Sequence, residues 1–253
     1  KIKNIHFVDD NLGGNQKHFM DLVKAIIDNN LDIAWGTNGL RVNNVASMSD
    51  DDLKLLEKSG CRELGIGVES GNQTFLNLMN KAITIEQVIK QNKRLAAYPF
   101  AIKYTFIIGF PTETKEDIDK TVKLALNLAN DNPNAWTRIS GYMPFPGTEM
   151  YDFAIKHGFC PPKDLEGWSK FNSLDSWHNH FGSWMSKEMV DYTDSIAFLS
   201  SLYNKNIRYK ITSKSMRFLF DVYRPFAKFR LEKSFHKFPI ELKLNMFIEK
   251  SGF

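Results

Sequence analysis

Along the first 157 residues of the chain, apolar and polar residues form two patterns that follow each other in turn. Short runs rich in β-branched and aliphatic residues are each followed by polar turn residues, and then by apolar residues at helical spacing. The runs begin 30 to 38 residues apart, close to the length of one strand-plus-helix unit. Such units favour parallel strands joined by crossover helices. The predicted strands are residues 2–8, 32–37, 63–68, 101–108 and 135–142.

The segments between these strands predict amphipathic helices with recognisable first residues. After the first strand, apolar residues follow the i, i+3, i+4, i+7 spacing of a helix packed on a sheet. Ser49 precedes three aspartates that favour the amino-terminal dipole of a helix. Thr84 with Gln87 has capping-box spacing, and Thr114 stands before another apolar helical stripe. The pattern therefore predicts five βα units.

Two α/β arrangements accept such units: an open doubly wound sheet and a closed or partly closed barrel. A doubly wound nucleotide fold normally has a glycine-rich turn after its first strand, but here that position begins with Asp9 and Asp10. Carboxylates have the wrong charge for a phosphate site. Distinctive residues instead follow every predicted strand, as in barrels whose site lies at the carboxyl ends of the strands. We therefore predict a partial barrel.

Beyond residue 157 the periodic pattern weakens. We predict three parts: the partial barrel (1–157), an irregular cap followed by a helix that begins near Ser186 (158–203), and a basic amphipathic extension (204–253). The net charge of +4 is unevenly shared, because the extension has 12 Lys or Arg and 4 Asp or Glu, whereas the remaining 203 residues have 21 and 25. The extension could pack on the barrel as a solvated helix, bind nucleic acid, or place residues 216–229 on a membrane surface.

Composition narrows the class of protein further. With 43% hydrophobic and 25% charged residues, the 253-residue chain is too apolar for a disordered tail. It has no apolar stretch long enough to span a membrane and no signal-peptide pattern, so we expect a cytoplasmic location. The two cysteines, Cys61 and Cys160, are too few for a disulfide framework and are expected to be free thiols.

The candidate functional residues follow the predicted strands, whose carboxyl ends meet on one rim of a barrel. Together they would suit a zwitterionic ligand with a ribose and a purine: carboxylates for an ammonium and a diol, arginine for a carboxylate, and glycine backbone beside a flat ring. Each also has a structural interpretation, as a helix cap, a solvated residue or a turn. In strand order they include Asp9 and Asp10, Arg41, Glu69 and Ser70, Gly109 and Pro111, and Tyr142 and Pro144.

Four sequence strings resemble the radical S-adenosylmethionine (radical SAM) enzymes, and most closely the subgroup that often carries an N-terminal cobalamin-binding domain. The resemblance covers residues 1–157 and implies a partial (β/α)6 TIM-like barrel with a C-terminal helical extension. In that barrel the first βα unit is missing, and the first strand here is the second of the family. The four strings are residues 7–11, 63–71, 106–114 and 142–148.

The resemblance implies roles for the residues after the first three strands. Asp9 and Asp10 stand where the family receives the methionine ammonium group. Arg41 matches an arginine near the methionine carboxylate or the substrate, and Glu69 and Ser70 match positions that contact the ribose or the amino acid moiety.

The resemblance places the residues of the last two strands against adenine. Ile108, Gly109 and Pro111 match the turn that lies along the adenine ring, and Tyr142 with Pro144 lies where the last strand completes that pocket.

The chain departs from the family in its cysteines. Radical SAM enzymes hold a [4Fe-4S] cluster through a CxxxCxxC loop after their first strand, and this chain has no such loop. Cys61 precedes its strand and Cys160 follows the last one, so neither is expected to bind the cluster. We expect the missing loop, and any cobalamin domain, to lie upstream of Lys1. His178 and His180 have a metal-ligand spacing without a third ligand, so we predict no metal ligand in this chain.

The resemblance implies a function for the full-length form. Such an enzyme cleaves S-adenosylmethionine to a 5′-deoxyadenosyl radical, with methyl transfer, which can depend on cobalamin, as the outcome most common in the subgroup. A small-molecule or lipid-like substrate and an electron donor such as flavodoxin or ferredoxin are expected, and the fragment alone is expected to be inactive. Two alternatives remain open: a cluster-less barrel that acts as a binding or scaffold subunit, and an RNA-modifying enzyme that grips RNA with its basic extension.

Overall fold

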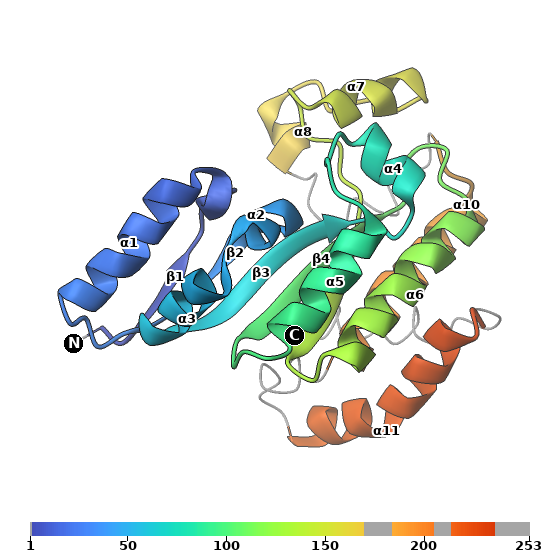
Figure 1. Cartoon of the computed structure of the whole chain (residues 1–253). Coiled ribbons are helices and arrows are strands. Elements are labelled where there is room, and N and C mark those ends of the chain that lie inside the picture. Colours follow the sequence, from blue (N-terminus) through green and yellow to red (C-terminus); the bar gives the residue numbers. More distant parts are fainter. Residues whose placement is uncertain (1, 170–183, 205–213, 236–253) are drawn as a thin grey trace. The chain divides into compact units, whose positions relative to one another are not determined.

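The computed structural model describes residues 2–169, 184–204 and 214–235 (Figure 1). It confirms the predicted α/β class, with five strands in one open sheet in the order β1-β2-β3-β4-β5. Strands β1 to β4 pair with their sequence neighbours in parallel register. The strands are β1 (Asn4–Phe7), β2 (Ala34–Arg41), β3 (Cys61–Glu69), β4 (Ala101–Ile108) and β5 (Ala135–Gly141).

The helices begin where the sequence predicts their caps. Ser49, Thr84 and Ser186 each accept a hydrogen bond from a backbone N–H in the first turn of the helix that follows. Helix α2 was not predicted, and the short helix α8 lies in the segment that was predicted to be irregular. The described helices are η1 (Leu12–Gly14), α1 (Gln16–Asp28), α2 (Val42–Ser47), α3 (Asp50–Lys58), α4 (Gln73–Leu78), α5 (Ile85–Leu95), α6 (Lys115–Asp131), α7 (Glu149–Lys156), α8 (Leu165–Ser169), α10 (Lys187–Tyr203) and α11 (Lys214–Glu232).

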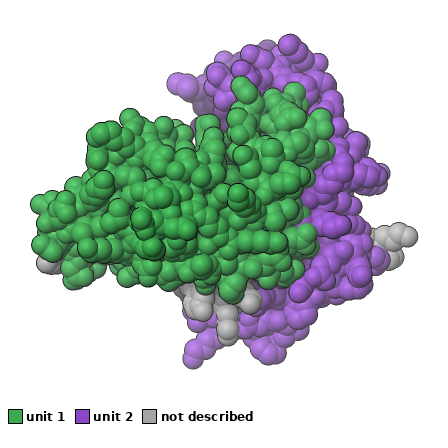
Figure 2. All heavy atoms as spheres, in the orientation of Figure 1, with its two compact units in different colours: residues 1–106, 124–137 green, residues 107–123, 138–253 purple. Residues whose placement is uncertain are grey.

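The chain forms two compact units (Figure 2). Unit 1 contains residues 1–106 and 124–137, and unit 2 contains residues 107–123 and 138–253. Three elements, β4, α6 and β5, run from one unit into the other. The domain boundaries at 157 and 203 stay predictions.

In unit 1, the sheet buries one set of alternate side chains and leaves the other set more accessible. Along β4, Ile102, Tyr104 and Phe106 are almost completely buried, whereas Lys103 and Thr105 are half-buried. The helical residues Leu53 and Val88 are also fully buried. The resulting apolar core holds the strands in register, and so fixes the position of their carboxyl ends.

A β-bulge in β2 positions the segment that follows β1. The register between β2 and β3 shifts between Thr37 and Leu40, at Asn38 and Gly39. A Cβ atom at Gly39 would lie 2.0 Å from the carbonyl oxygen of Asp9, so only glycine fits there. The sequence predicted that the second strand ends at Thr37. The strand instead continues through the bulge to Arg41.

Unit 2 is built around the first half of α6 and the helices α10 and α11. Ile118, Ile196 and Leu199 are fully buried in it. The hydroxyl of Tyr192 on α10 donates a hydrogen bond of 2.5 Å to Asp119 on α6, and α10 packs against α11. No helix among the described residues is both long enough and apolar enough to cross a membrane.

Candidate functional site

The carboxyl ends of β1, β2 and β3 lie next to one another in unit 1. Phe7, near the end of β1, pairs with Thr37 in β2, and Arg41 at the end of β2 pairs with Gly67 in β3. Beyond β1, the chain stays next to β2, because the backbone of Asp9 contacts Gly39. The sequence-predicted residues of unit 1 therefore follow three neighbouring strand ends, as a rim site requires.

Asp9 and Asp10 are exposed and do not begin helix α1. Asn15 is the cap of α1, because its side chain accepts a hydrogen bond of 3.0 Å from the backbone N–H of His18. The capping interpretation of the two aspartates is therefore wrong. Next to them, the buried Oδ1 atom of Asn11 has no hydrogen-bond partner among the described residues. Two exposed carboxylates and a buried acceptor thus follow β1.

Arg41 occupies the position before helix α2. Its backbone N–H donates a hydrogen bond of 2.7 Å to the side chain of Asn44, while its guanidinium side chain is exposed. Asn44 also donates a hydrogen bond of 2.9 Å to the carbonyl of Gly13, which ties the segment after β1 to α2. The backbone of Arg41 thus has a structural role that does not depend on its side chain.

Glu69 is the last residue of β3 and adopts a left-handed conformation with φ of 75°. Its carboxylate forms an ion pair with Lys81 at 3.0 Å, and its side chain is 15% exposed. A Cβ atom at Gly67 would lie 2.7 Å from Oε1 of Glu69, so the glycine makes room for this carboxylate. Sequence reasoning missed Lys81, because nothing local links it to the end of β3.

Ser70, the residue after Glu69, is fully buried. Its hydroxyl accepts a hydrogen bond of 3.1 Å from the backbone N–H of Asn72, and Asn72 in turn caps α4 through the N–H of Thr74. Neither Glu69 nor Ser70 is therefore the cap of α4, although Ser70 supports the turn that precedes the cap.

In unit 2, the predicted adenine-side residues are buried where β4 and β5 end. The backbone N–H of Tyr142 donates a hydrogen bond of 2.8 Å to the carbonyl of Ile108, which joins the two ends. Gly109 has a φ of 87°, a conformation that favours glycine. Pro111 and Pro144 are also buried. The two segments that carry these five residues are thus joined by the hydrogen bond between Tyr142 and Ile108.

Glu113 stabilises the turn after β4 through hydrogen bonds with its backbone. Its Oε2 atom accepts hydrogen bonds from the backbone N–H groups of Gly109 and Phe110, at 2.5 Å and 3.1 Å. The side chain is buried and its Oε1 atom has no partner among the described residues. Burial raises the pKa of Glu113 to about 7, although the two N–H donors favour the charged form. Glu113 lay in a motif string but was not among the predicted site residues.

Trp184 covers the same turn from a distant part of the sequence. Its indole N–H donates a hydrogen bond of 3.1 Å to the carbonyl of Gly109. Its ring lies 6.0 Å from that of Tyr142 and 5.7 Å from that of Phe159, measured between centroids. Sequence reasoning placed Trp184 only in an irregular cap, because no local pattern predicts a contact across 75 residues.

Neither cysteine belongs to a group of possible metal ligands among the described residues. Cys61 is the first residue of β3, at the amino end of the strand, where burial raises the pKa of its thiol to about 12. Cys160 is exposed. Within the described ranges there is no group of three His, Cys, Asp or Glu residues that could hold a metal ion. His178 and His180 lie outside the described residues.

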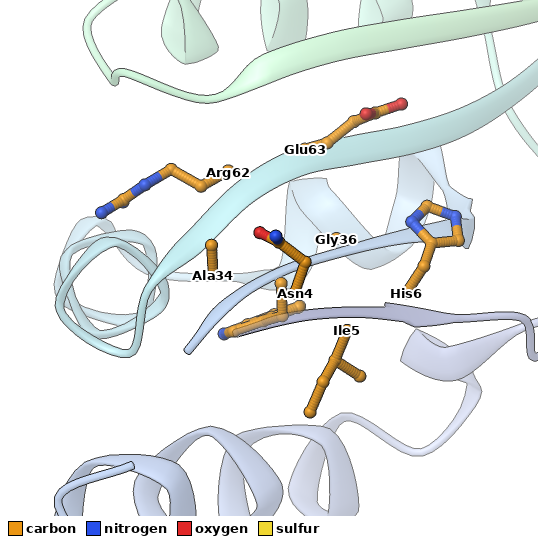
Figure 3. Close-up of a pocket in the computed structure, with 8 residues that line it drawn as sticks. Asn4, Ile5, His6, Ala34, Gly36, Arg62 and Glu63 are labelled. Carbon is orange, nitrogen blue, oxygen red and sulfur yellow. The ribbon is translucent and has the colours of Figure 1, made fainter. Parts of the chain in front are cut away.

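A separate pocket of about 270 Å³ lies at the amino-terminal half of β1, β2 and β3 (Figure 3). Gly36 leaves space in the centre, since a Cβ atom there would lie 3.0 Å from Cβ of Glu63 and 3.3 Å from Nδ1 of His6. His6 is exposed, with Nε2 2.8 Å from the side chain of Asn38, so it is hydrogen-bonded rather than packed in a core. None of the predicted site residues lines this pocket. The lining residues are Asn4, Ile5, His6, Ala34, Trp35, Gly36, Arg62 and Glu63.

Residues 2–125 match the family model of the Radical SAM superfamily, and the chain belongs to this superfamily. It is 31% identical over 174 residues to an uncharacterised methyltransferase of Pyrococcus horikoshii, a match that covers 69% of this chain and 36% of that protein. The chain thus spans about a third of the length of this curated relative.

Solved structures support the fold. The cobalamin-dependent S-adenosylmethionine radical enzyme OxsB, with aqua-cobalamin bound, matches with a TM-score of 0.54 and 13% identity, over 98% of this chain and 43% of that one. The radical S-adenosylmethionine methyltransferase TsrM from Kitasatospora setae, with tryptophan and a SAM analogue bound, matches with a TM-score of 0.51 and 16% identity. That match covers 63% of this chain and 32% of that one. The predicted fold class, a partial barrel of the radical SAM type, is therefore confirmed.

Proposed function

We propose that this chain supplies the S-adenosylmethionine-binding part of a radical SAM methyltransferase. One observation carries the proposal: three neighbouring parallel strands end in exposed or accessible charged residues of the kinds that a zwitterionic ligand needs. The superfamily match over residues 2–125 and the methyltransferase relative support it. The cobalamin-dependent structural neighbours favour a cobalamin-dependent form.

In this proposal the charged strand ends of unit 1 recognise the amino acid moiety of the ligand. Asp9 and Asp10 receive its ammonium group, and Arg41 its carboxylate. Glu69 and Ser70 contact the ribose or the amino acid moiety. The exposure of Asp9 and Asp10, the buried Oδ1 atom of Asn11 without a partner among the described residues, and the space that Gly67 leaves for Glu69 fit these roles.

Considered by themselves, the residues at the ends of β4 and β5 in unit 2 suit a flat ring such as the adenine that the sequence resemblance assigns to them. A flat apolar ring suits the backbone of Ile108 and Gly109 and the buried faces of Pro111, Tyr142 and Pro144. These groups offer few charges, so they would contribute burial and shape rather than charge pairing.

The residues present do not fit the [4Fe-4S] cluster of the superfamily. Cluster ligands are thiolates, and the chain has only two cysteines. The high pKa of Cys61 keeps its thiol protonated, and it begins β3 at the end of the strand opposite to the candidate site. Reductive cleavage and methyl transfer by the whole protein therefore need cluster ligands from outside these 253 residues.

Calorimetric titration of the chain with S-adenosylmethionine tests the proposal. We expect saturable binding, and a loss of affinity of about tenfold or more when Asp9→Asn and Asp10→Asn are combined, because charge-assisted hydrogen bonds are lost. Asp28→Asn, which changes an exposed carboxylate on α1, serves as the matched control and should bind like the wild type.

A second titration separates the amino acid contacts from the adenine contacts. 5′-Methylthioadenosine lacks the ammonium and carboxylate groups, so the Asp9 and Asp10 substitutions should leave its affinity unchanged. The proposal fails if the wild type binds no S-adenosylmethionine. The assignment of the two aspartates fails if their substitution weakens both ligands equally.

The count of two cysteines favours a second candidate, a binding or scaffold barrel without catalysis. It predicts that the whole protein, reconstituted anaerobically with iron and sulfide, retains no iron after desalting. Retention of about four iron atoms per protein, the content of a [4Fe-4S] cluster, would exclude this candidate.

A further inference from the structure

Helix α11 presents apolar side chains on two opposite faces. Ala227 and Leu231 are almost completely buried, on the helix that packs against α10. Half a turn away around the helix axis lie four exposed apolar residues, at spacings of i, i+4, i+8 and i+11, which form one stripe along the helix. We call them the apolar stripe: Phe218 (71% exposed), Val222 (61%), Phe226 (39%) and Phe229 (48%).

Helix α5 shows what the outward face of a helix in this protein otherwise looks like. Its buried positions are Val88, Gln91, Asn92 and Leu95, and its exposed positions hold the polar residues Glu86, Gln87, Lys90 and Lys93. On α11 the exposed stripe is instead aromatic and aliphatic. Isolated exposed apolar residues are ordinary, but a contiguous stripe on one helix indicates a surface that is covered by something else.

The charges beside the apolar stripe indicate what covers it. Helix α11 carries five Lys or Arg residues and two acidic ones, a net charge of +3. Helical geometry at 100° per residue places four of the cations along one side of the stripe, together with Asp221 and Glu232, so this side has a net charge of +2. These four, which we call the cationic flank, are Lys214, Arg217, Arg224 and Lys228.

An apolar stripe bordered by cations is the pattern of a helix that lies in the plane of a membrane surface. There, the apolar side chains enter the boundary between headgroups and acyl chains, while the cations contact anionic headgroups. We propose that α11 docks on an anionic lipid bilayer through the apolar stripe and the cationic flank.

Two other kinds of occupant match these features less well. A nucleic acid would neutralise the cationic flank, but it would leave much of a stripe that includes Val222 in contact with water. A second copy docked through the same stripe would bring two helices of net charge +3 together, which like-charge repulsion opposes. An anionic bilayer satisfies both the apolar and the cationic parts at once.

Vesicle cosedimentation of the whole chain tests the proposal. We expect binding to vesicles of phosphatidylcholine mixed with phosphatidylglycerol, weaker binding to phosphatidylcholine alone, and a decrease as NaCl screens the charges. Phe218→Ser combined with Phe229→Ser should lower the partition coefficient by about tenfold or more, because two large apolar side chains are lost. Leu165→Ser, at an 87% exposed leucine on α8, is the matched control.

A second pair of variants separates charge from apolar burial. Lys214→Glu with Arg224→Glu should abolish the preference for phosphatidylglycerol, whereas Lys24→Glu on α1, also an exposed lysine, should retain it. Because the stripe is exposed, the circular dichroism spectrum of the serine variant should match that of the wild type. Hydrogen exchange of the unaltered chain gives a variant-free measurement, in which residues 214–232 gain protection on vesicles while α5 does not.

Several outcomes would overturn the proposal. It fails if wild-type binding is equal for both kinds of vesicle, or if the serine variant binds like the wild type. It also fails if the chain does not bind vesicles but forms a dimer that the serine variant dissociates, since the stripe then joins two copies. Binding of RNA but not of vesicles, with loss of RNA binding in the glutamate variant, assigns the cationic flank to nucleic acid instead.

Discussion

The predicted site residues at the strand ends of the two units differ in their exposure and in the contacts that they make. In unit 1, Asp9, Asp10 and the side chain of Arg41 are exposed, whereas Glu69 is half-buried and Ser70 is fully buried. In unit 2, Gly109 and Tyr142 are buried within a set of hydrogen bonds and ring contacts. We therefore expect substitution of the exposed residues to change the free energy of unfolding little, and substitution of the buried residues of unit 2 to lower it more.

The difference in exposure matches the kind of ligand group that each region would suit. Charged groups that bind a charged ligand need access to it, and exposed charges contribute little to folding. A surface for a flat apolar ring needs buried, close-packed groups, and these also belong to the core. Substitutions in the two regions should therefore separate stability from ligand binding.

The largest expected effect comes from Trp184→Ala in unit 2. The change removes ring contacts with Tyr142 and Phe159 and leaves the carbonyl of Gly109 without its indole donor. We expect the free energy of unfolding, measured in urea, to fall by about 3 to 4 kcal/mol. Trp184→Phe keeps much of the ring packing and should cost about 1 kcal/mol. A loss below about 0.5 kcal/mol for the alanine variant would contradict the packing role.

An intermediate effect is expected for Glu113→Gln, as a change in pH dependence. The raised pKa means that the folded chain keeps the Glu113 proton after the unfolded chain has lost it, so this group destabilises the fold as the pH rises from about 5 toward 8. The wild type should lose about 2 to 3 kcal/mol relative to the glutamine variant over that range, at about 1.4 kcal/mol per pKa unit.

Urea unfolding at several pH values measures this difference. Glu116→Gln, at an exposed glutamate in the first turn of the nearby helix α6, is the matched control and should follow the pH dependence of the wild type. Parallel pH profiles for the wild type and the Glu113 variant would show that burial of this carboxyl does not affect stability.

The smallest effect on stability is expected for Arg41→Gln in unit 1. Its backbone N–H, not its side chain, makes the hydrogen bond to Asn44, so the variant should unfold within about 0.5 kcal/mol of the wild type. S-Adenosylmethionine affinity should nevertheless fall, in the same titration used for Asp9 and Asp10. A large loss of stability would place Arg41 with the packed residues of unit 2.

Much of the fold could be predicted because its signals are local. The five strands and the caps at Ser49, Thr84, Thr114 and Ser186 depend on periodicity and on residues three positions apart. The end of β2 was misplaced, because Asn38-Gly39 resembles a turn in sequence whereas the structure continues the strand through a bulge.

The sequence predicted which strand each site residue follows, but it did not predict which residues surround it. The sequence located Glu69 and Gly109 at strand ends, but it could not indicate the ion pair with Lys81 or the hydrogen bond from Trp184. These partners come from other elements, and single-sequence patterns contain no information about them. The roles assigned to the site residues in ligand binding stay predictions until the titrations are made.

The sequence by itself determined the βα rhythm, the helix caps, the polar residues after each strand, and a cysteine count too low for a cluster. Only the tertiary structure decided which of those residues are exposed and which are buried. It also showed that α11 is apolar on its outward face as well as its buried face. Periodicity depends on neighbouring residues, whereas burial and pairing depend on segments that meet only after the chain has folded.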